Sequence, residues 1–137
     1  MNKTLRIEHL NPAGMRQNPA FTNVVAVSGA GRTLYIGAID PVDVAGALVG
    51  PGDLAAQTTQ VFKNLELALA GGGATLEQIV LWRIYIVEGQ AMERAAGVFM
   101  QVWGRRPNPP ANTIVFVPAL GYPGSLIALE ALAVVPA

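Results

Sequence analysis

Apolar and polar residues follow two periods along this chain, and the change from one period to the other marks the predicted elements. Alternation with period two, or a short apolar run between turn residues, predicts strands. They cover residues 4–10, 24–27, 33–39, 79–87, 109–117 and 126–135. Apolar residues three and four apart predict one helix between Asp53 and the glycines at 71–73 and a second over 90–103. A capping-box pattern at 75–78 predicts one further helical turn.

This order of elements predicts an α+β fold with one six-stranded mixed sheet and two helices. The turn at residues 28–31 predicts a hairpin between the second and third strands. A strand, a helix and a further strand form a right-handed crossover, and two crossovers of the same hand place both helices on one face of the sheet. The chain is expected to form a single domain over residues 1–137, because this length can build one core.

The opposite face of the predicted sheet stays uncovered although its residues are largely apolar. Apolar residues make up 52% of the chain and charged residues only 13%. Large apolar areas facing water usually mark an interface, so we expect a homo-oligomer. The alternative is a monomer with a mildly apolar surface. Nine basic and nine acidic residues cancel, which disfavours binding to nucleic acid or to an anionic membrane.

The composition also excludes several kinds of site. The chain has no cysteine, so it has no disulfide, thiolate metal site or cysteine nucleophile. His9 is the one histidine, is expected to be exposed, and leaves a zinc site short of ligands. We therefore expect no metal and no cofactor. The N-terminal residues lack the apolar core of a signal peptide, and no stretch is long enough to span a membrane, which favours the cytoplasm.

The remaining candidates are isolated polar residues near apolar strands. Glu130 lies in the last strand, where a carboxylate is costly unless it is paired. It is either an acid or ligand-positioning group in a cleft, or a structural partner of Arg83. Asn112 and Thr113 begin the strand after two prolines and offer uncharged donors and acceptors, although Asn112 also suits a turn. Arg105, with its neighbour Arg106, could reach an anionic ligand from the adjacent loop. Three aromatic residues are assigned to the core: Trp82, Phe99 and Trp103.

Several short segments, taken in order, resemble a known family. They are Leu34-Tyr35-Ile36-Gly37-Ala38, Asp53-Leu54-Ala55-Ala56-Gln57-Thr58, Gly73-Ala74-Thr75-Leu76, Pro110-Ala111-Asn112-Thr113 and Leu129-Glu130-Ala131-Leu132-Ala133. Each is weakly specific, but their order and spacing are similar to those of the Rid family. These are small YjgF-type proteins, also labelled endoribonuclease L-PSP, that include reactive imine and enamine deaminases. The resemblance covers nearly the whole chain. It implies a chorismate-mutase-like α+β fold, a homotrimer and ligand clefts between subunits.

The resemblance also implies where a cleft would lie and how this chain departs from the active deaminases. The arginine that grips the substrate carboxylate is replaced by Asn112, and the cleft serine by Gly37. The cleft tyrosine falls on Phe21, and the asparagine of the second helix on about Ala96. The water-activating glutamate falls on Ala128, which leaves Glu130 as the candidate catalytic residue. The implied ligand-binding residues are Phe21, Tyr35, Gly37, Ala38, Arg105, Asn112, Thr113 and Ala128.

Four functions follow as alternatives. The favoured one is a divergent trimer that binds, or binds and hydrolyses, a small and more neutral metabolite between its subunits. The second is a deaminase acting on C=N bonds that converts 2-imino acids to 2-keto acids and ammonia, with Arg105 or Arg106 in place of the missing arginine. The third is a purely structural or chaperone-like trimer. A ribonuclease or translation-inhibiting role is disfavoured by the zero net charge.

Overall fold

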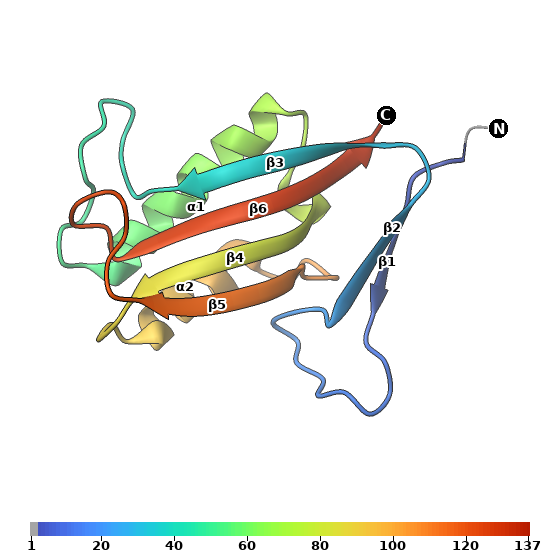
Figure 1. Ribbon diagram of the computed structural model, residues 1–137, viewed down its shortest axis with the longest axis horizontal. Coiled ribbons are helices and arrows are strands. Elements are labelled where there is room, and N and C mark those ends of the chain that lie inside the picture. Colours follow the sequence, from blue (N-terminus) through green and yellow to red (C-terminus); the bar gives the residue numbers. More distant parts are fainter. Residues whose placement is uncertain (1–2) are drawn as a thin grey trace.

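The computed structural model describes residues 3–137 and shows two helices packed on one face of a mixed sheet (Figure 1). The sheet has the strand order β3-β6-β4-β5. These strands are β3 (Gly31–Ile39), β4 (Ile79–Val87), β5 (Ala111–Val117) and β6 (Ile127–Pro136). Strand β5 runs parallel to β4, whereas β6 is antiparallel to both β3 and β4. The predicted α+β class is therefore confirmed, including the placement of both helices on one face.

The first two strands do not join this sheet, which corrects the prediction of six strands in one sheet. Strands β1 (Arg6–Leu10) and β2 (Val24–Ser28) pair only with each other, in a separate two-stranded ribbon. The predicted hairpin between the second and third strands is wrong for the same reason. Gly29, at a φ of 85°, packs its backbone against Thr4, and the Ala30 N–H donates to the Lys3 carbonyl at 2.8 Å. These contacts turn the chain away from β2 before β3 begins.

Both helices begin and end close to the predicted residues. Helix α1 (Leu54–Gly71) is capped by Asp53, whose Oδ1 accepts the Ala56 N–H at 3.1 Å. Its chain exit passes through Gly73 at a φ of 79°, a conformation that glycine adopts without strain. The predicted extra turn is the short helix η1 (Leu76–Gln78), where the Thr75 N–H donates to Gln78 Oε1. Helix α2 (Met92–Trp103) starts two residues later than predicted.

Within residues 3–137, no helix is both long enough and apolar enough to cross a membrane.

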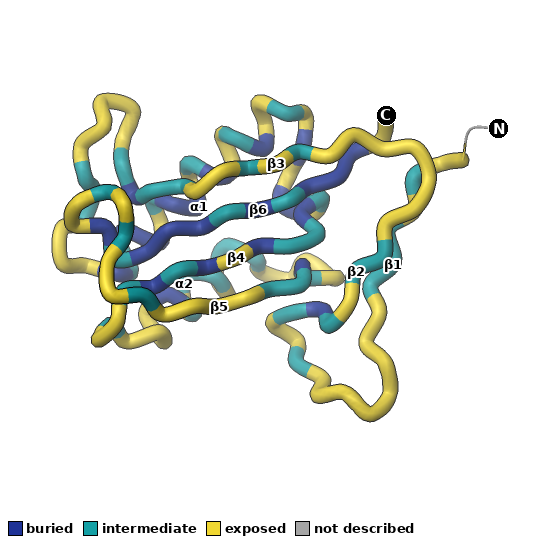
Figure 2. Tube along the Cα trace, in the orientation of Figure 1, coloured by how far each residue is buried: buried dark blue, intermediate teal, exposed yellow. Residues whose placement is uncertain are grey.

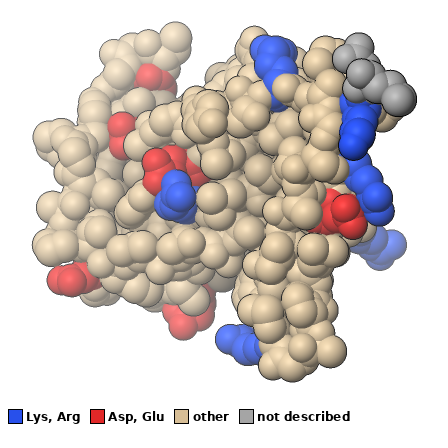
Figure 3. All heavy atoms as spheres, turned by 45° about the vertical axis from the view of Figure 1, so that its right-hand side comes forward, with Lys and Arg blue, Asp and Glu red and all other residues tan. Residues whose placement is uncertain are grey.

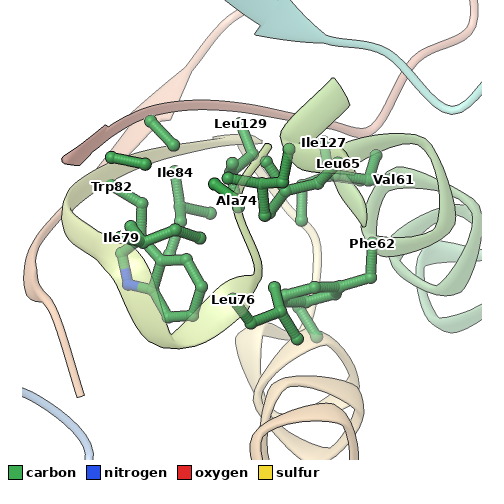
Figure 4. Packing of buried hydrophobic residues seen from close by; sticks show 14 of the residues in the cluster. Val61, Phe62, Leu65, Ala74, Leu76, Ile79, Trp82, Ile84, Ile127 and Leu129 are labelled. Atoms are coloured by element: carbon green, nitrogen blue, oxygen red, sulfur yellow. The ribbon is translucent and has the colours of Figure 1, made fainter. Parts of the chain in front are cut away.

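The hydrophobic core lies between the helices and the sheet, and it is built from alternate residues of each strand. Figure 4 shows Val61, Phe62 and Leu65 of α1 packed toward Ile84 and Leu129 of the sheet. Figure 2 shows most residues of β6 and about every second residue of β4 as buried. Period-two alternation in the sequence therefore sorted most strand residues correctly between the two faces, but it fails at the start of β4, where the register shifts between Ile79 and Leu81.

The other face of the sheet is open in a single chain. Tyr35 of β3 is 81% exposed there, and Val115 of the edge strand β5 is 37% exposed. Figure 3 shows few charged atoms among the uncharged ones over this side of the molecule. We call this surface the open face, and it is formed by Tyr35, Gly37, Leu81, Arg83, Tyr85, Thr113, Val115, Glu130 and Leu132.

One buried amide connects α1 to two loops at the end of the sheet. The Gln57 side chain is fully buried, and its Nε2 donates to the carbonyls of Gly50 at 3.2 Å and Gly124 at 3.1 Å. Its Oε1 accepts the Leu126 N–H at 2.7 Å, immediately before β6. Both N–H donors and the oxygen of this amide are therefore used to hold the loops against the helix.

The Gln57→Leu substitution is expected to lower the free energy of unfolding by about 1–3 kcal/mol, because it leaves a buried N–H and two carbonyls without a partner. Denaturant unfolding of both proteins measures the difference. Leu67→Ala on the same helix is the control, since Leu67 is 66% exposed and its truncation should change stability by less than about 0.5 kcal/mol. Equal stability of Gln57→Leu and the parent protein would contradict the assigned role.

Candidate functional site

A cavity of about 420 Å³ lies between α2 and the strands β4 and β5, on the side of the sheet that carries the helices. Its volume falls within the range of small-molecule sites, roughly 300–1,000 Å³. Met100, Ile114 and Met92, which are 71%, 41% and 38% exposed, place its rim at the molecular surface. The full lining is Pro19, Ala20, Trp82, Ile84, Ile86, Met92, Ala95, Ala96, Phe99, Met100, Trp103, Gly104, Asn112 and Ile114.

The inner wall is an aromatic cluster that fixes α2 above β4. The Trp82 ring packs edge to face against Phe99 at a centroid distance of 5.4 Å and against Trp103 at 5.8 Å. Phe62 of α1 packs in the same manner on Phe99, at 4.5 Å. Such pairs add stability beyond their buried area and hold the rings in fixed orientations. The aromatic wall of the cavity is thus preformed.

The start of β5 is held in place by the segment that precedes β2. Thr22 is buried, and its Oγ1 donates to the Pro109 carbonyl at 2.5 Å while its N–H donates to the Pro110 carbonyl at 3.3 Å. This docking brings Pro19 and Ala20 to the cavity wall. The proline-marked entry to β5 therefore joins two segments that lie about ninety residues apart in the sequence.

Three residues of the cavity wall have a polar side-chain group: Asn112, Trp82 and Trp103. The first two are paired in register between β5 and β4, so both side chains lie on the helix-covered face. No side-chain hydrogen bond joins the Asn112 amide or the Trp82 Nε1 to another residue from 3 to 137, and neither is among the buried polar atoms that lack a partner, so both groups are accessible from the cavity or from solvent. The nitrogen of Trp103, in contrast, donates to the Arg106 carbonyl at 2.7 Å. Two uncharged polar groups are consequently free at an apolar wall.

A second hollow, of about 410 Å³, lies on the open face and includes Tyr35, Gly37, Arg83 and Glu130. Glu130 Oε1 accepts the Tyr85 hydroxyl at 2.5 Å and lies 3.6 Å from Arg83 Nη1. The hydrogen bond to Glu130, with a smaller contribution from burial, raises the pKa of Tyr85 above its ordinary value of 10.0. The carboxylate of Glu130 is thus paired with Arg83, as the sequence predicts for one of its two possible roles, and Tyr85 is a second partner.

The predicted site residues lie in two places rather than one within this chain. Asn112 lines the cavity, whereas Tyr35, Gly37 and Glu130 line the hollow on the open face. Thr113 points to the open face, opposite to Asn112, because it pairs with Arg83. The other predicted residues line neither space: they are Phe21, Ala38, Arg105 and Ala128.

The two loop arginines differ in what holds them. Arg106 Nη1 donates to the carbonyls of Val102 at 2.9 Å and Trp103 at 3.1 Å, and its Nε lies 3.5 Å from Glu77 Oε1. This guanidinium caps the C-terminal end of α2, where free carbonyls attract positive charge. Arg105 is exposed and follows Gly104, which lines the cavity, but is itself not part of the wall.

Sequence reasoning missed most of the cavity wall. Trp82, Phe99 and Trp103 were assigned to the core, and they do pack there, but they also line the cavity. Met92 and Met100 gave no signal beyond their helical spacing.

His9 lines neither the cavity nor the second hollow, and it is partly buried rather than exposed. Burial lowers its pKa, and its Nε2 has no partner among the described residues. Among residues 3–137 no three His, Asp or Glu side chains gather as a metal site.

Comparisons with known proteins agree with the fold. The family model named Endoribonuclease L-PSP matches residues 15–135. The protein YyfB from Yersinia pestis, a Rid family member of unknown function, is 35% identical, with a TM-score of 0.81 and coverage of 94% of this chain and 98% of its own. Rv2704 from Mycobacterium tuberculosis, of the YjgF/YER057c/UK114 family, is 32% identical over 75% of this chain and 79% of its own, with a TM-score of 0.62. No curated protein matches the chain.

A third solved structure, of YyfA from Yersinia pestis, is 26% identical over 95% of this chain and 100% of its own, with a TM-score of 0.69. It too is described as a Rid family protein of unknown function. The family model matches most of the chain, and the solved structures share its two-helix sheet. The chain therefore belongs to the Rid family of Endoribonuclease L-PSP proteins.

Proposed function

We propose that this chain is a divergent Rid-family protein that binds a small, uncharged and largely apolar molecule in the cavity between α2 and strands β4 and β5. The observation that carries the proposal is the chemistry of the cavity wall. Among the described residues that line it, none carries a charge, and Asn112 and Trp82 supply the free side-chain polar groups. An apolar wall with a few placed polar groups is the usual form of a small-molecule site.

The same wall disfavours a 2-imino acid as the ligand. A carboxylate moved from water into an apolar site is costly unless a cation and hydrogen bonds compensate. The resemblance places the carboxylate-gripping arginine at Asn112, and an amide provides neither the charge nor the bidentate fork of a guanidinium. Arg106 is engaged at the end of α2, and Arg105 is not part of the wall. Standard imine deamination is therefore not the activity we propose.

We also propose that three chains assemble through the open face. This surface is apolar apart from the cluster around Glu130, and Tyr35 is 81% exposed on it. A second copy would remove that apolar area from water, which stabilises the assembly by about 25 cal/mol per Å². Assembly would also bring the two groups of predicted site residues together. The open face of one copy, with Glu130, could approach the cavity rim of another copy, with Asn112. Glu130, as a candidate catalytic residue, belongs to that arrangement.

The deaminase alternative requires an arginine to enter the cavity. Arg105 is the candidate, since it is exposed and adjoins Gly104. The chaperone-like alternative requires a surface that holds unfolded chains, and the open face would serve it only while uncovered. Each alternative predicts results that differ from those expected for a neutral ligand in the cavity. The experiments below therefore distinguish the alternatives from the proposed function.

The protein is expected not to suppress trapping of an imine by semicarbazide when an amino acid oxidase generates 2-imino acids from several amino acids. The physical reason is the absence of a cation at the cavity wall. The rate of semicarbazone formation, read by its absorbance, is the measurement. An active Rid deaminase is the positive control, and Arg105→Ala tests whether residual suppression depends on this arginine. Strong suppression by the parent protein would refute the proposed ligand class.

Light scattering is expected to report about three chains per particle. The Tyr35→Asp substitution should shift the protein toward monomers, because it would bury a charge without a partner in the interface that we propose on the open face. Leu67→Asp is the matched control, since it adds the same charge at an exposed apolar residue on the helix side and should leave the particle mass unchanged. A monomeric parent protein, or equal behaviour of the two variants, would argue against assembly through the open face.

The pH dependence of stability tests the pairing of Tyr85 with Glu130. Because the native pKa of Tyr85 is raised, the native state holds a proton that the unfolded chain loses above pH 10.0. Stability from this group is complete below that pH and falls as the pH rises through the native pKa. Urea unfolding should show a smaller alkaline loss for Tyr85→Phe than for the parent protein, and an intermediate loss for Glu130→Gln. Parallel curves would show that the hydrogen bond does not persist in solution.

A further inference from the structure

We infer that the ligand of the cavity is an aromatic molecule with a neutral amide-like head group, which Asn112 selects against carboxylates; this inference rests on the proposed function. The paired positions of Asn112 and Trp82 on neighbouring strands carry it. Their side chains lie on the same face of the sheet, and both line the cavity. We call the Asn112 amide and the Trp82 Nε1–H the polar end of the cavity and the rest of its lining the apolar end.

The polar end offers a complementary set of donors and acceptors. The Asn112 side chain provides one carbonyl acceptor and an NH₂ group, and the Trp82 Nε1–H is a donor. None of these is used by another side chain or backbone group from 3 to 137, and Figure 4 shows the Trp82 nitrogen turned away from the packed Phe62 and Leu76. A polar group that has no protein partner and is accessible at an apolar wall can pair with a ligand that enters the cavity. A primary amide both accepts and donates, as this set requires.

The absence of charge at this end decides between an amide and a carboxylate of the same shape. A carboxylate only accepts hydrogen bonds, so the Asn112 NH₂ group and the Trp82 N–H could donate to it, but the Asn112 carbonyl oxygen would receive no proton from it. It would also lose its hydration without gaining a cation. The two head groups are nearly identical in size, so the discrimination comes from hydrogen bonding and charge rather than from fit.

The apolar end suits an aromatic body. Trp82, Phe99 and Trp103 line it with aromatic carbon, and Met92 and Met100 add two thioethers. Aromatic rings pack favourably both on other rings and on methionine sulfur. The cavity, at about 420 Å³, is nearly three times as large as the roughly 150 Å³ cavity that holds benzene in another protein. The site therefore has room for a ring together with its head group.

Three probes with the same phenyl body test the inference: phenylacetamide, phenylacetate and ethylbenzene. The chain has two tryptophans, Trp82 and Trp103, and both line the cavity, so tryptophan fluorescence of the full-length protein reports binding directly. Phenylacetamide is expected to bind at least about tenfold more tightly than phenylacetate and about tenfold more tightly than ethylbenzene. Each factor of ten corresponds to about 1.4 kcal/mol, which is the size of one or two net hydrogen bonds.

Variants at the polar end assign the discrimination to its residues. Asn112→Leu should bring phenylacetamide and ethylbenzene to similar affinities, whereas Asn112→Arg should reverse the preference in favour of phenylacetate. Trp82→Phe keeps an aromatic ring and removes the N–H, so it should weaken phenylacetamide about tenfold and leave ethylbenzene nearly unchanged, with Trp103 as the remaining reporter. Leu67→Arg is the control for added charge outside the cavity and should change no affinity.

The outcomes separate this inference from the proposed function. Equal binding of phenylacetamide and ethylbenzene would overturn the amide-like head group while leaving an apolar neutral ligand in place. Tighter binding of phenylacetate by the parent protein would overturn both. Binding of none of the three probes, in a protein whose unfolding is cooperative, would also overturn both. An amide preference that survives in Asn112→Leu would overturn the role of Asn112 as the specificity-determining residue.

Discussion

The edge-to-face packing of Phe62, Trp82, Phe99 and Trp103 is the interaction on which the rest of the structure depends. It joins α1, α2 and β4 in one rigid cluster, with ring centroids 4.5–5.9 Å apart. Rings of this size hold α2 over β4 and leave the edge strand β5 incompletely covered, as the exposure of Ile114 and Phe116 shows. The cavity is thus a consequence of how the core packs.

The two faces of the sheet have different chemistry because two helices can cover only one of them. On the covered face, apolar residues are buried and the cavity retains two uncharged polar groups. On the open face, the carboxylate of Glu130 is held by Tyr85 and Arg83, which makes a charge tolerable in an apolar strand. The proposed neutral ligand would use the covered face and the proposed assembly the open face, so the two would not compete for the same residues.

Family membership accounts for the fold, whereas the side chains that line the cavity determine its chemistry. The Rid-family relatives share the two-helix sheet, yet YyfB and YyfA are themselves proteins of unknown function. The fold alone therefore supports no particular reaction. This chain has an amide, Asn112, at the entry of β5, in a cavity lined by aromatic and thioether side chains, and we base the proposed ligand on that chemistry.

Most of the local structure could be predicted from the residues alone, because strand and helix periods and capping residues act over a few positions. These patterns predicted β4 at Ile79–Val87, the Asp53 cap, the extra turn before β4 and the helices on one face. The separation of β1 and β2 from the main sheet could not be predicted in this way, since it depends on contacts of Gly29 and Ala30 with the N-terminal segment. The cavity, likewise, required the distance between α2 and β5, which is set by ring packing among residues far apart in the sequence. For this reason Asn112 was recognisable from the chain, but the wall that it faces was not.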